Sequence, residues 1–128
     1  MLKLNVNNET SKLLAVVLGT AKSNGNAPSL EDCYDPKSRE NILANTYPLE
    51  KDMITELRQF EEVLVKHNVK VYRPKVINDY NQIFSRDIGF VIDDFFIVSN
   101  ILPERSKEIS AIDKLIDLIR EYGDWVEK

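Results

Sequence analysis

The sequence has few of the side chains that metal sites and nucleophilic catalysts use. Its 128 residues include one cysteine, Cys33, and one histidine, His67. A single cysteine cannot form a disulfide within the chain, and one cysteine with one histidine is too small a set for a zinc site. A Walker phosphate loop is absent, and no GxGxxG motif follows the first apolar run. We therefore expect neither a metal nor a cofactor.

Long apolar runs and an excess of one charge are missing as well. No run approaches the roughly 20 residues of a membrane-spanning helix. Residues 1–12 lack the apolar core of a secretory signal. The net charge of −4 gives no reason to expect a nucleic-acid or membrane partner. Together with the single cysteine, this composition predicts one compact domain in a reduced, cytoplasmic setting.

Neither Cys33 nor His67 has the surroundings of a catalyst. Asp32 and Asp35 lie close to Cys33 in the sequence, and acidic neighbours disfavour the thiolate that a nucleophile requires. His67 falls at the end of an expected helix, where a histidine stabilises the negative end of the helix dipole. The sequence thus predicts no catalytic residue in this chain.

Apolar runs indicate four strands. The run 13–19, "LLAVVLG", is continuous and ends at a glycine, which is typical of a strand buried on both faces. Apolar residues from Phe84 to Ile92 also indicate a strand, and Asp93-Asp94 then predicts the tight turn of a hairpin. The expected strands are residues 13–19, 69–73, 89–92 and 95–98.

The first of two expected amphipathic helices covers residues 49–67. Pro48 suits a first turn, and Glu50 and Asp52 lie near the positive end of the helix dipole. Asn68 can adopt the left-handed conformation that ends a helix. Apolar residues at helical spacing predict one buried stripe, made of Met53, Leu57, Phe60 and Leu64.

The second expected helix covers residues 106–122. It starts around Pro103, and Gly123 can end it. Its expected buried face consists of Ile109, Ile112, Leu115, Ile116 and Ile119. Strands and helices together predict a mixed α/β chain with the helices laid against a sheet.

Residues 20–46 form a long segment rich in asparagine, serine, glycine and proline. Such a segment, without clear periodicity, is uncommon in a compact domain. The sequence leaves two interpretations open: a functional or mobile loop, and a solvated surface insertion.

Arg86 and Asp87 interrupt an apolar stretch. Successive strand residues point to opposite faces, so one of the two charges is expected to face an interior. One interpretation is an internal salt bridge, or a pair of edge charges that prevents aggregation. The other is a ligand site, because an aspartate on rigid backbone matches the paired N–H groups of a guanidinium.

The segment 81–108, "NQIFSRDIGFVIDDFFIVSNILPERSKE", resembles the guanidine-modifying enzymes. This superfamily contains arginine deiminases, dimethylarginine hydrolases and amidinotransferases. The resemblance implies a five-bladed α/β propeller, the pentein-like fold, of which this chain would supply the first two ββαβ-type modules. The residues that carry the resemblance are Asn81, Ser85-Arg86-Asp87, Arg105 and Glu108.

The resemblance also implies roles for individual residues. Asp87 would bind the guanidinium of the substrate, and Arg105 would pair with the substrate's carboxylate. Asn81 would add a neutral hydrogen bond near the same end of the substrate. Arg86 would organise the local structure.

The chemistry of this superfamily requires a cysteine nucleophile, a histidine acid/base and a further carboxylate. Neither Cys33 nor His67 lies in a matching motif. We therefore expect residues 1–128 to be the substrate-recognising N-terminal part of a longer amidinotransferase or arginine deiminase-like hydrolase, inactive alone. Two alternatives stay open: a non-catalytic module that binds guanidino compounds or amino acids, and a structural α/β interaction domain.

The same resemblance predicts a partner. An incomplete propeller leaves an apolar face between modules uncovered, so we expect self-association or association with a C-terminal part of the same protein. The expected ligand is a small guanidino compound such as arginine, and neither nucleic acid nor membrane is expected.

Overall fold

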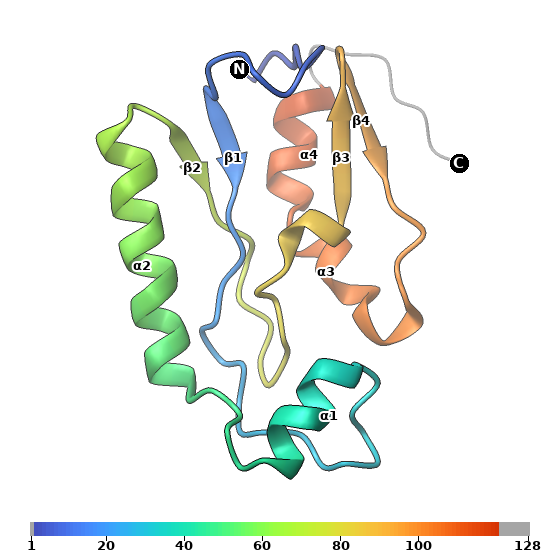
Figure 1. The fold of residues 1–128 in the computed structure, drawn as a ribbon. Coiled ribbons are helices and arrows are strands. Elements are labelled where there is room, and N and C mark those ends of the chain that lie inside the picture. Colours follow the sequence, from blue (N-terminus) through green and yellow to red (C-terminus); the bar gives the residue numbers. More distant parts are fainter. Residues whose placement is uncertain (1, 121–128) are drawn as a thin grey trace.

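A computed structural model describes residues 2–120 and shows a mixed α/β chain (Figure 1). This confirms the predicted fold class. Two short 3-10 turns, residues 85–87 and 103–105, precede β3 and α3. The helices and strands are β1 (Ala15–Val17), α1 (Pro36–Leu43), α2 (Glu50–Lys66), β2 (Lys70–Tyr72), β3 (Gly89–Ile92), β4 (Phe95–Val98), α3 (Lys107–Ser110) and α4 (Asp113–Arg120).

The strands form two separate two-stranded sheets. In the first, β1 and β2 are parallel, with Val17 opposite Tyr72. The chain between them includes α1 and α2, and α2 runs beside them (Figure 1). In the second, β3 and β4 form an antiparallel hairpin. The finer prediction of a partial five-bladed propeller goes beyond these two small sheets and stays a prediction.

The prediction that residues 13–19 form a strand buried on both faces is wrong. The strand β1 covers only three residues, all of them half-buried. Leu14, just before it, is 69% exposed. The physical reason is that β1 lies in a sheet of two strands, which offers less surface for packing on both faces than a wide parallel sheet between helices does.

The hairpin has the predicted bounds, and Asp93-Asp94 form the predicted tight turn between Ile92 and Phe95. Asp93 adopts the left-handed conformation, with φ 51°. The strand expected from Phe84 to Ile92, however, begins only at Gly89. Residues 85–87 form a 3-10 turn instead, so Arg86 and Asp87 do not alternate across a sheet as predicted.

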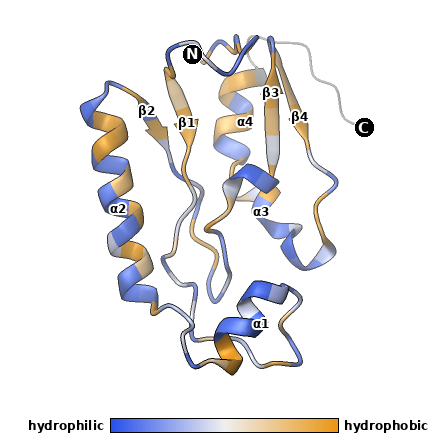
Figure 2. Cartoon of the chain, in the orientation of Figure 1, coloured by the Kyte–Doolittle hydropathy of each residue, from blue (hydrophilic) through white to orange (hydrophobic). Residues whose placement is uncertain are grey.

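The main core lies between the hairpin and α4. Its buried members are Ile88, Ile112, Leu115, Ile116 and Ile119. Val17 and Tyr72, from the first sheet, and Phe96, from the hairpin, pack against the same cluster. Figure 2 shows the apolar residues concentrated on the strands and on part of α4. The predicted apolar face of the second helix is therefore confirmed as core.

The second helix is less continuous than predicted. It is divided into α3 and α4 around Ala111, whose N–H donates to the Glu108 carbonyl at 3.2 Å in a tight i to i+3 turn. Residues 121 and 122, and Gly123 as the predicted end of the helix, lie outside the described residues.

The helix α2 has the predicted start and end. Glu50 and Asp52 lie in its first turn, and Asn68 exits in the left-handed conformation with φ 59°. Met53 is buried, Leu57 and Leu64 are half-buried, and Phe60 is 52% exposed, so the predicted buried stripe is confirmed at Met53, partial at the two leucines and wrong at Phe60. The cause is the narrow surface beneath α2, which has only two strands to pack on.

The segment 20–46 contains a helix that was not predicted. Asp35 caps α1, its carboxylate accepting the Ser38 backbone N–H at 2.7 Å, and Pro36 occupies the first helical position. The Asp-Pro pair was the available sequence signal.

Among the described residues, no helix combines the length and the apolar character that crossing a bilayer requires.

Candidate functional site

The Arg105 guanidinium lies at the centre of a cluster of charged side chains. It forms a two-pronged contact with Glu108, from Nε to Oε1 at 2.6 Å and from Nη2 to Oε2 at 2.9 Å. Its Nη1 donates to Oδ2 of Asp87, and its Nη2 also donates to the Phe84 carbonyl at 3.0 Å. The cluster therefore joins the turn before β3 to the turn before α3.

Burial decreases across this cluster from Glu108 to Asp87. The whole Glu108 residue is 0% exposed, whereas the side chains of Arg105 and Asp87 are 13% and 41% exposed. Hydrogen bonds to Glu108 raise the pKa of Arg105 above its ordinary value, although burial opposes the rise. The guanidinium is therefore a permanent cation, and its carboxylate partners range from fully enclosed to solvent-facing.

The hydrogen bonds of Arg105 occupy most of its donors. A guanidinium has five N–H groups. One N–H is bound to Glu108 through Nε, two are bound through Nη2, and one is bound to Asp87 through Nη1. One Nη1–H is left, so Arg105 offers no free pair of N–H groups to a substrate carboxylate unless it releases Asp87.

The turn that carries Asp87 is fixed to the first sheet. The Ser85 hydroxyl donates to the Val17 carbonyl at 3.0 Å, just where β1 ends. The backbone at Gly19 lies close to the backbone at Ile83, because a Cβ on Gly19 would be 2.0 Å from the carbonyl oxygen of Ile83. The backbone beneath Asp87 is therefore held by residues far away in the sequence.

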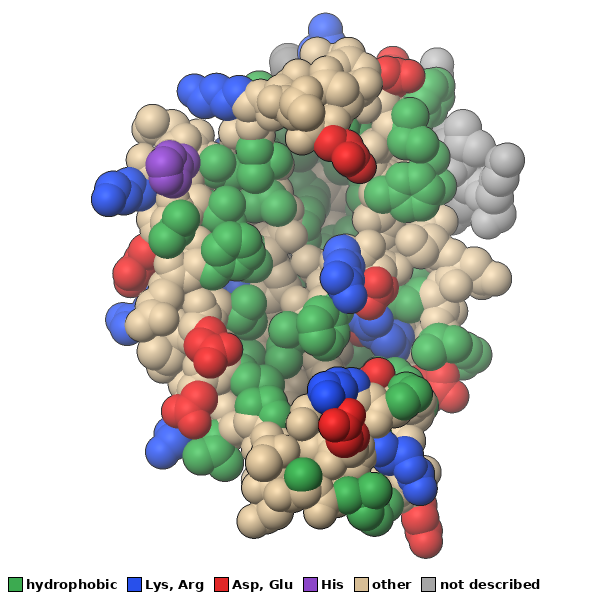
Figure 3. Space-filling view, viewed as in Figure 1, with side chains coloured by type: hydrophobic (Ala, Val, Ile, Leu, Met, Phe, Trp, Pro, Cys, Tyr) green, Lys and Arg blue, Asp and Glu red, His purple; other side chains and the backbone are tan. Residues whose placement is uncertain are grey.

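Arg86 lies at the surface beside this turn. Its side chain is 82% exposed, with Nε 3.6 Å from Oδ1 of Asp87. Its guanidinium also lies over the Phe84 ring, 5.5 Å from the centroid. Figure 3 shows acidic and basic side chains gathered near the middle of this face of the molecule. Arg86 thus contacts Asp87 from the solvent side, whereas Arg105 contacts it from the interior.

The structure brings three of the four predicted site residues together. Asp87 lies between Arg105 and Arg86. The fourth, Asn81, lies in the preceding loop, where its Oδ1 accepts the Ile83 N–H at 3.1 Å. The predicted role of Arg105 on a substrate carboxylate, and that of Asn81 beside it, stay predictions.

Two tyrosines near the cluster were not predicted from the sequence. The Tyr80 hydroxyl donates to the Glu104 carbonyl, and Tyr34 comes from the segment before α1. Burial raises the pKa of both tyrosines, and the positive charge of Arg105 opposes that rise in both. Part of the long segment 20–46 therefore lies within the electrostatic reach of the Arg105 cluster, which no local pattern could have indicated.

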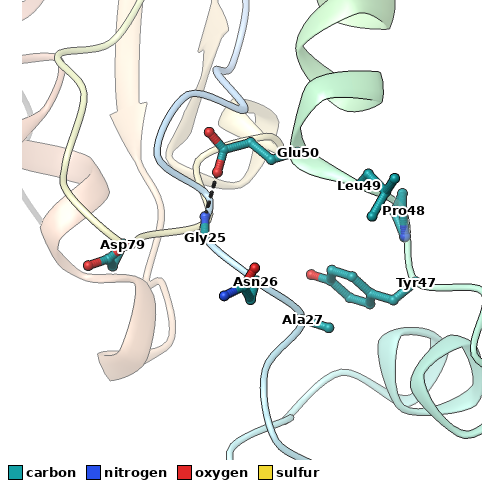
Figure 4. A pocket seen from close by; sticks show the side chains of 8 residues that line it. All are labelled: Gly25, Asn26, Ala27, Tyr47, Pro48, Leu49, Glu50 and Asp79. Carbon is teal, nitrogen blue, oxygen red and sulfur yellow. Dashed lines mark hydrogen bonds between the residues drawn. The ribbon is translucent and has the colours of Figure 1, made fainter.

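A pocket of about 260 Å³ lies beside the start of α2 (Figure 4). The Glu50 carboxylate there accepts the backbone N–H groups of Ser23 at 3.2 Å and Gly25 at 2.8 Å. None of the predicted site residues lines this pocket. The lining residues are Gly25, Asn26, Ala27, Tyr47, Pro48, Leu49, Glu50 and Asp79.

Among the described residues, neither Cys33 nor His67 makes a hydrogen bond with the charged cluster. The Cys33 thiol is buried and donates to the Asp35 carbonyl at 3.4 Å, and His67 is the exposed residue that follows α2. Across residues 2–120, no three His, Cys, Asp or Glu side chains are grouped so as to hold a metal ion.

No family model and no curated protein matches the chain.

Proposed function

We propose that this chain recognises guanidino compounds through Asp87. The observation that supports the proposal is that Asp87 already binds a guanidinium, that of Arg105, through one carboxylate oxygen. Across residues 2–120, the ion-pair partner of the second oxygen, Oδ1, is the exposed Arg86, at 3.6 Å. A carboxylate that is 41% exposed on an anchored turn is suited to accept N–H groups from a ligand guanidinium.

The proposed roles of the other residues follow the resemblance. Arg105 binds the carboxylate of an arginine-like ligand, and Asn81 adds a hydrogen bond near that end. Among the described residues, Arg105 keeps a single unpaired N–H, on Nη1, so it binds that carboxylate through one hydrogen bond and stays on Asp87. The ligand guanidinium binds the other oxygen of Asp87, Oδ1.

The proposed wider context is a guanidine-modifying enzyme. In this proposal the chain forms two modules of a pentein-like propeller and supplies substrate recognition, as part of an amidinotransferase or an arginine deiminase-like hydrolase. The cysteine nucleophile and the histidine acid/base are not assigned to residues of this chain. The 128-residue protein alone is therefore expected to release no product from arginine.

The exchange of Asp87 for asparagine tests the binding role. Asparagine keeps the shape and loses the charge, so we expect the Kd for L-arginine to rise about ten- to a hundredfold, as lost charged hydrogen bonds predict. The melting temperature should change little, because partly exposed ion pairs contribute about 1 kcal/mol or less. Calorimetric titration and thermal unfolding measure the two quantities.

Asp94→Asn is the matched control, because Asp94 is an exposed aspartate in the hairpin turn. Its affinity for arginine should equal that of the wild type.

The competing function is a structural α/β domain, which the direct Arg105–Asp87 pair also favours. An Asp87→Asn protein that unfolds at much lower temperature yet binds arginine as the wild type does would establish that second function.

We also propose that the chain self-associates. The outer face of the hairpin supports this, because Phe90 and Ile92 are each 50% exposed and Phe95, opposite Ile92, is 39% exposed. An apolar sheet face of this kind is stabilised by a second surface that removes it from water. Sedimentation at micromolar concentration should show a dimer or a larger species, and a monomer at all concentrations would contradict this part of the proposal.

A further inference from the structure

Glu108 is the most enclosed charged residue in the described part of the chain. It has 0% exposure and lies in α3. Both of its carboxylate oxygens accept hydrogen bonds from Arg105. Because Glu108 is fully buried and both of its oxygens are bound to Arg105, it is poorly placed to touch a ligand, and its route of influence on a ligand runs through Arg105.

The two-pronged contact fixes the plane of the Arg105 guanidinium. A carboxylate that accepts from Nε and Nη2 together aligns the two planar groups, which a single hydrogen bond does not do. Once that plane is fixed, the direction of Nη1 is fixed as well, and Nη1 points at Oδ2 of Asp87. The order of contacts therefore runs from the buried Glu108 through Arg105 to the half-exposed Asp87.

The Asp87 side chain lies in a three-residue 3-10 turn, residues 85–87, and is 41% exposed. A contact from a firmly held partner therefore restricts its orientation. The other charged group in contact with it is Arg86, whose side chain is 82% exposed and 3.6 Å away. Arg105 is the firmly held partner, and it holds Oδ2 of Asp87, whereas Oδ1 has the exposed Arg86 as its ion-pair partner.

We propose that Glu108 is a positioning residue for ligand binding: it clamps Arg105, and Arg105 in turn orients the Asp87 carboxylate toward a guanidino ligand. This inference rests on the proposed function of Asp87. It assigns Glu108 no contact with the ligand. It also predicts that Glu108 affects ligands that have no carboxylate at all.

Agmatine is the probe that tests this, because it carries a guanidinium and has no carboxylate for Arg105 to bind. Glu108→Gln replaces one of the two acceptors by an N–H donor, which breaks the two-pronged contact. We expect the Kd for agmatine to rise about tenfold or more, in line with the loss of charged hydrogen bonds. Calorimetric titration gives the Kd, and thermal unfolding of the same sample gives the melting temperature.

Two further variants complete the experiment. Arg105→Lys retains the charge but cannot bind Glu108, Asp87 and the Phe84 carbonyl together, so it should weaken agmatine binding to a similar extent even if Glu108→Gln does not fold. Glu104→Gln removes a nearby exposed carboxylate and should bind agmatine as the wild type does. Weaker binding by the first two variants, with the control unchanged, supports the proposal.

The contrary results are distinct. If Glu108→Gln and Arg105→Lys have lower melting temperatures but unchanged Kd values for agmatine, Glu108 is purely structural and the positioning role is overturned. If agmatine binds the wild type and Asp87→Asn equally well, the proposed function fails first, and the positioning role fails with it. The same outcome follows if the wild-type protein binds no agmatine.

Discussion

The helices α2 and α4 make opposite uses of their apolar residues. Although α2 has 17 residues, Met53 is the only buried one. The helix α4 has eight residues, and three of them are in the core at 4 to 8% exposure, namely Leu115, Ile116 and Ile119. The difference lies in what each helix covers: α2 lies beside a narrow sheet, whereas α4 packs against side chains from both sheets.

The ion pairs of the two regions differ in the same way. Arg73 and Glu61 join β2 to α2 at 2.9 Å, with side chains 30% and 34% exposed. Arg105 and Glu108 lie beside the core, with side chains 13% and 1% exposed. Buried ion pairs are held more tightly than exposed ones, and they cost more to break. The candidate site is thus built on the better-packed region of the molecule.

The largest expected effect concerns the two apolar helix faces. Ile116→Ala should lower the free energy of unfolding by about 2–5 kcal/mol, because it leaves a cavity in the core. Phe60→Ala should cost about 1 kcal/mol or less, because Phe60 is already 52% exposed. Urea denaturation measures both values.

If Ile116→Ala and Phe60→Ala lowered the free energy of unfolding by equal amounts, the contrast between α4 and α2 would be lost. Such a result would mean that α2 is covered by another surface in solution, for example by a second copy of the chain. Repeating the denaturation at several protein concentrations distinguishes the two cases, because stabilisation by association depends on concentration.

A smaller effect is expected at α1, which has no buried residue at all. Hydrogen bonds from Ser38 lower the pKa of Asp35 below its ordinary value of 3.8. The stabilisation by the charged cap is therefore fully present above about pH 3.8 and is lost as the pH falls through the lower pKa of the folded state. Loss of such a cap costs about 1 kcal/mol.

Helical Cα chemical shifts of residues 36–43 report on this cap. They should decrease on acidification in the wild type, and in Asp35→Ala they should be small already at neutral pH. Asp35→Asn keeps a capping side chain that does not titrate, so its shifts should not follow the pKa of Asp35. Shifts that are the same in all three proteins would show that α1 depends on contacts other than its cap.

The sequence predicted best where local pattern and tertiary packing agree. The hairpin and the apolar face of α4 were correct, because strand and helix periodicity there coincide with real burial. The exposure of Phe60 could not be predicted, because it depends on the width of the sheet under α2. The helix α1 was missed since it has no apolar stripe, although its Asp35-Pro36 cap was visible.

The candidate site was predicted in part. Asp87, Arg86 and Arg105 were identified from a motif, and the structure places them in contact. The motif also included Glu108, but sequence spacing could not show that Glu108 is fully buried or that it binds Arg105 with both oxygens. Which partners a guanidinium has is decided by the packing of segments far apart in the chain.

The most direct test of a guanidinium-recognising Asp87 compares L-arginine with L-citrulline as ligands of the wild-type protein. The two molecules have the same shape and the same carboxylate, but citrulline carries a neutral ureido group in place of the guanidinium. Since the proposed role of Asp87 is to bind the positive charge, calorimetric titration should give arginine a Kd about ten- to a hundredfold lower than that of citrulline. Equal affinities, or no binding of either, would contradict the account.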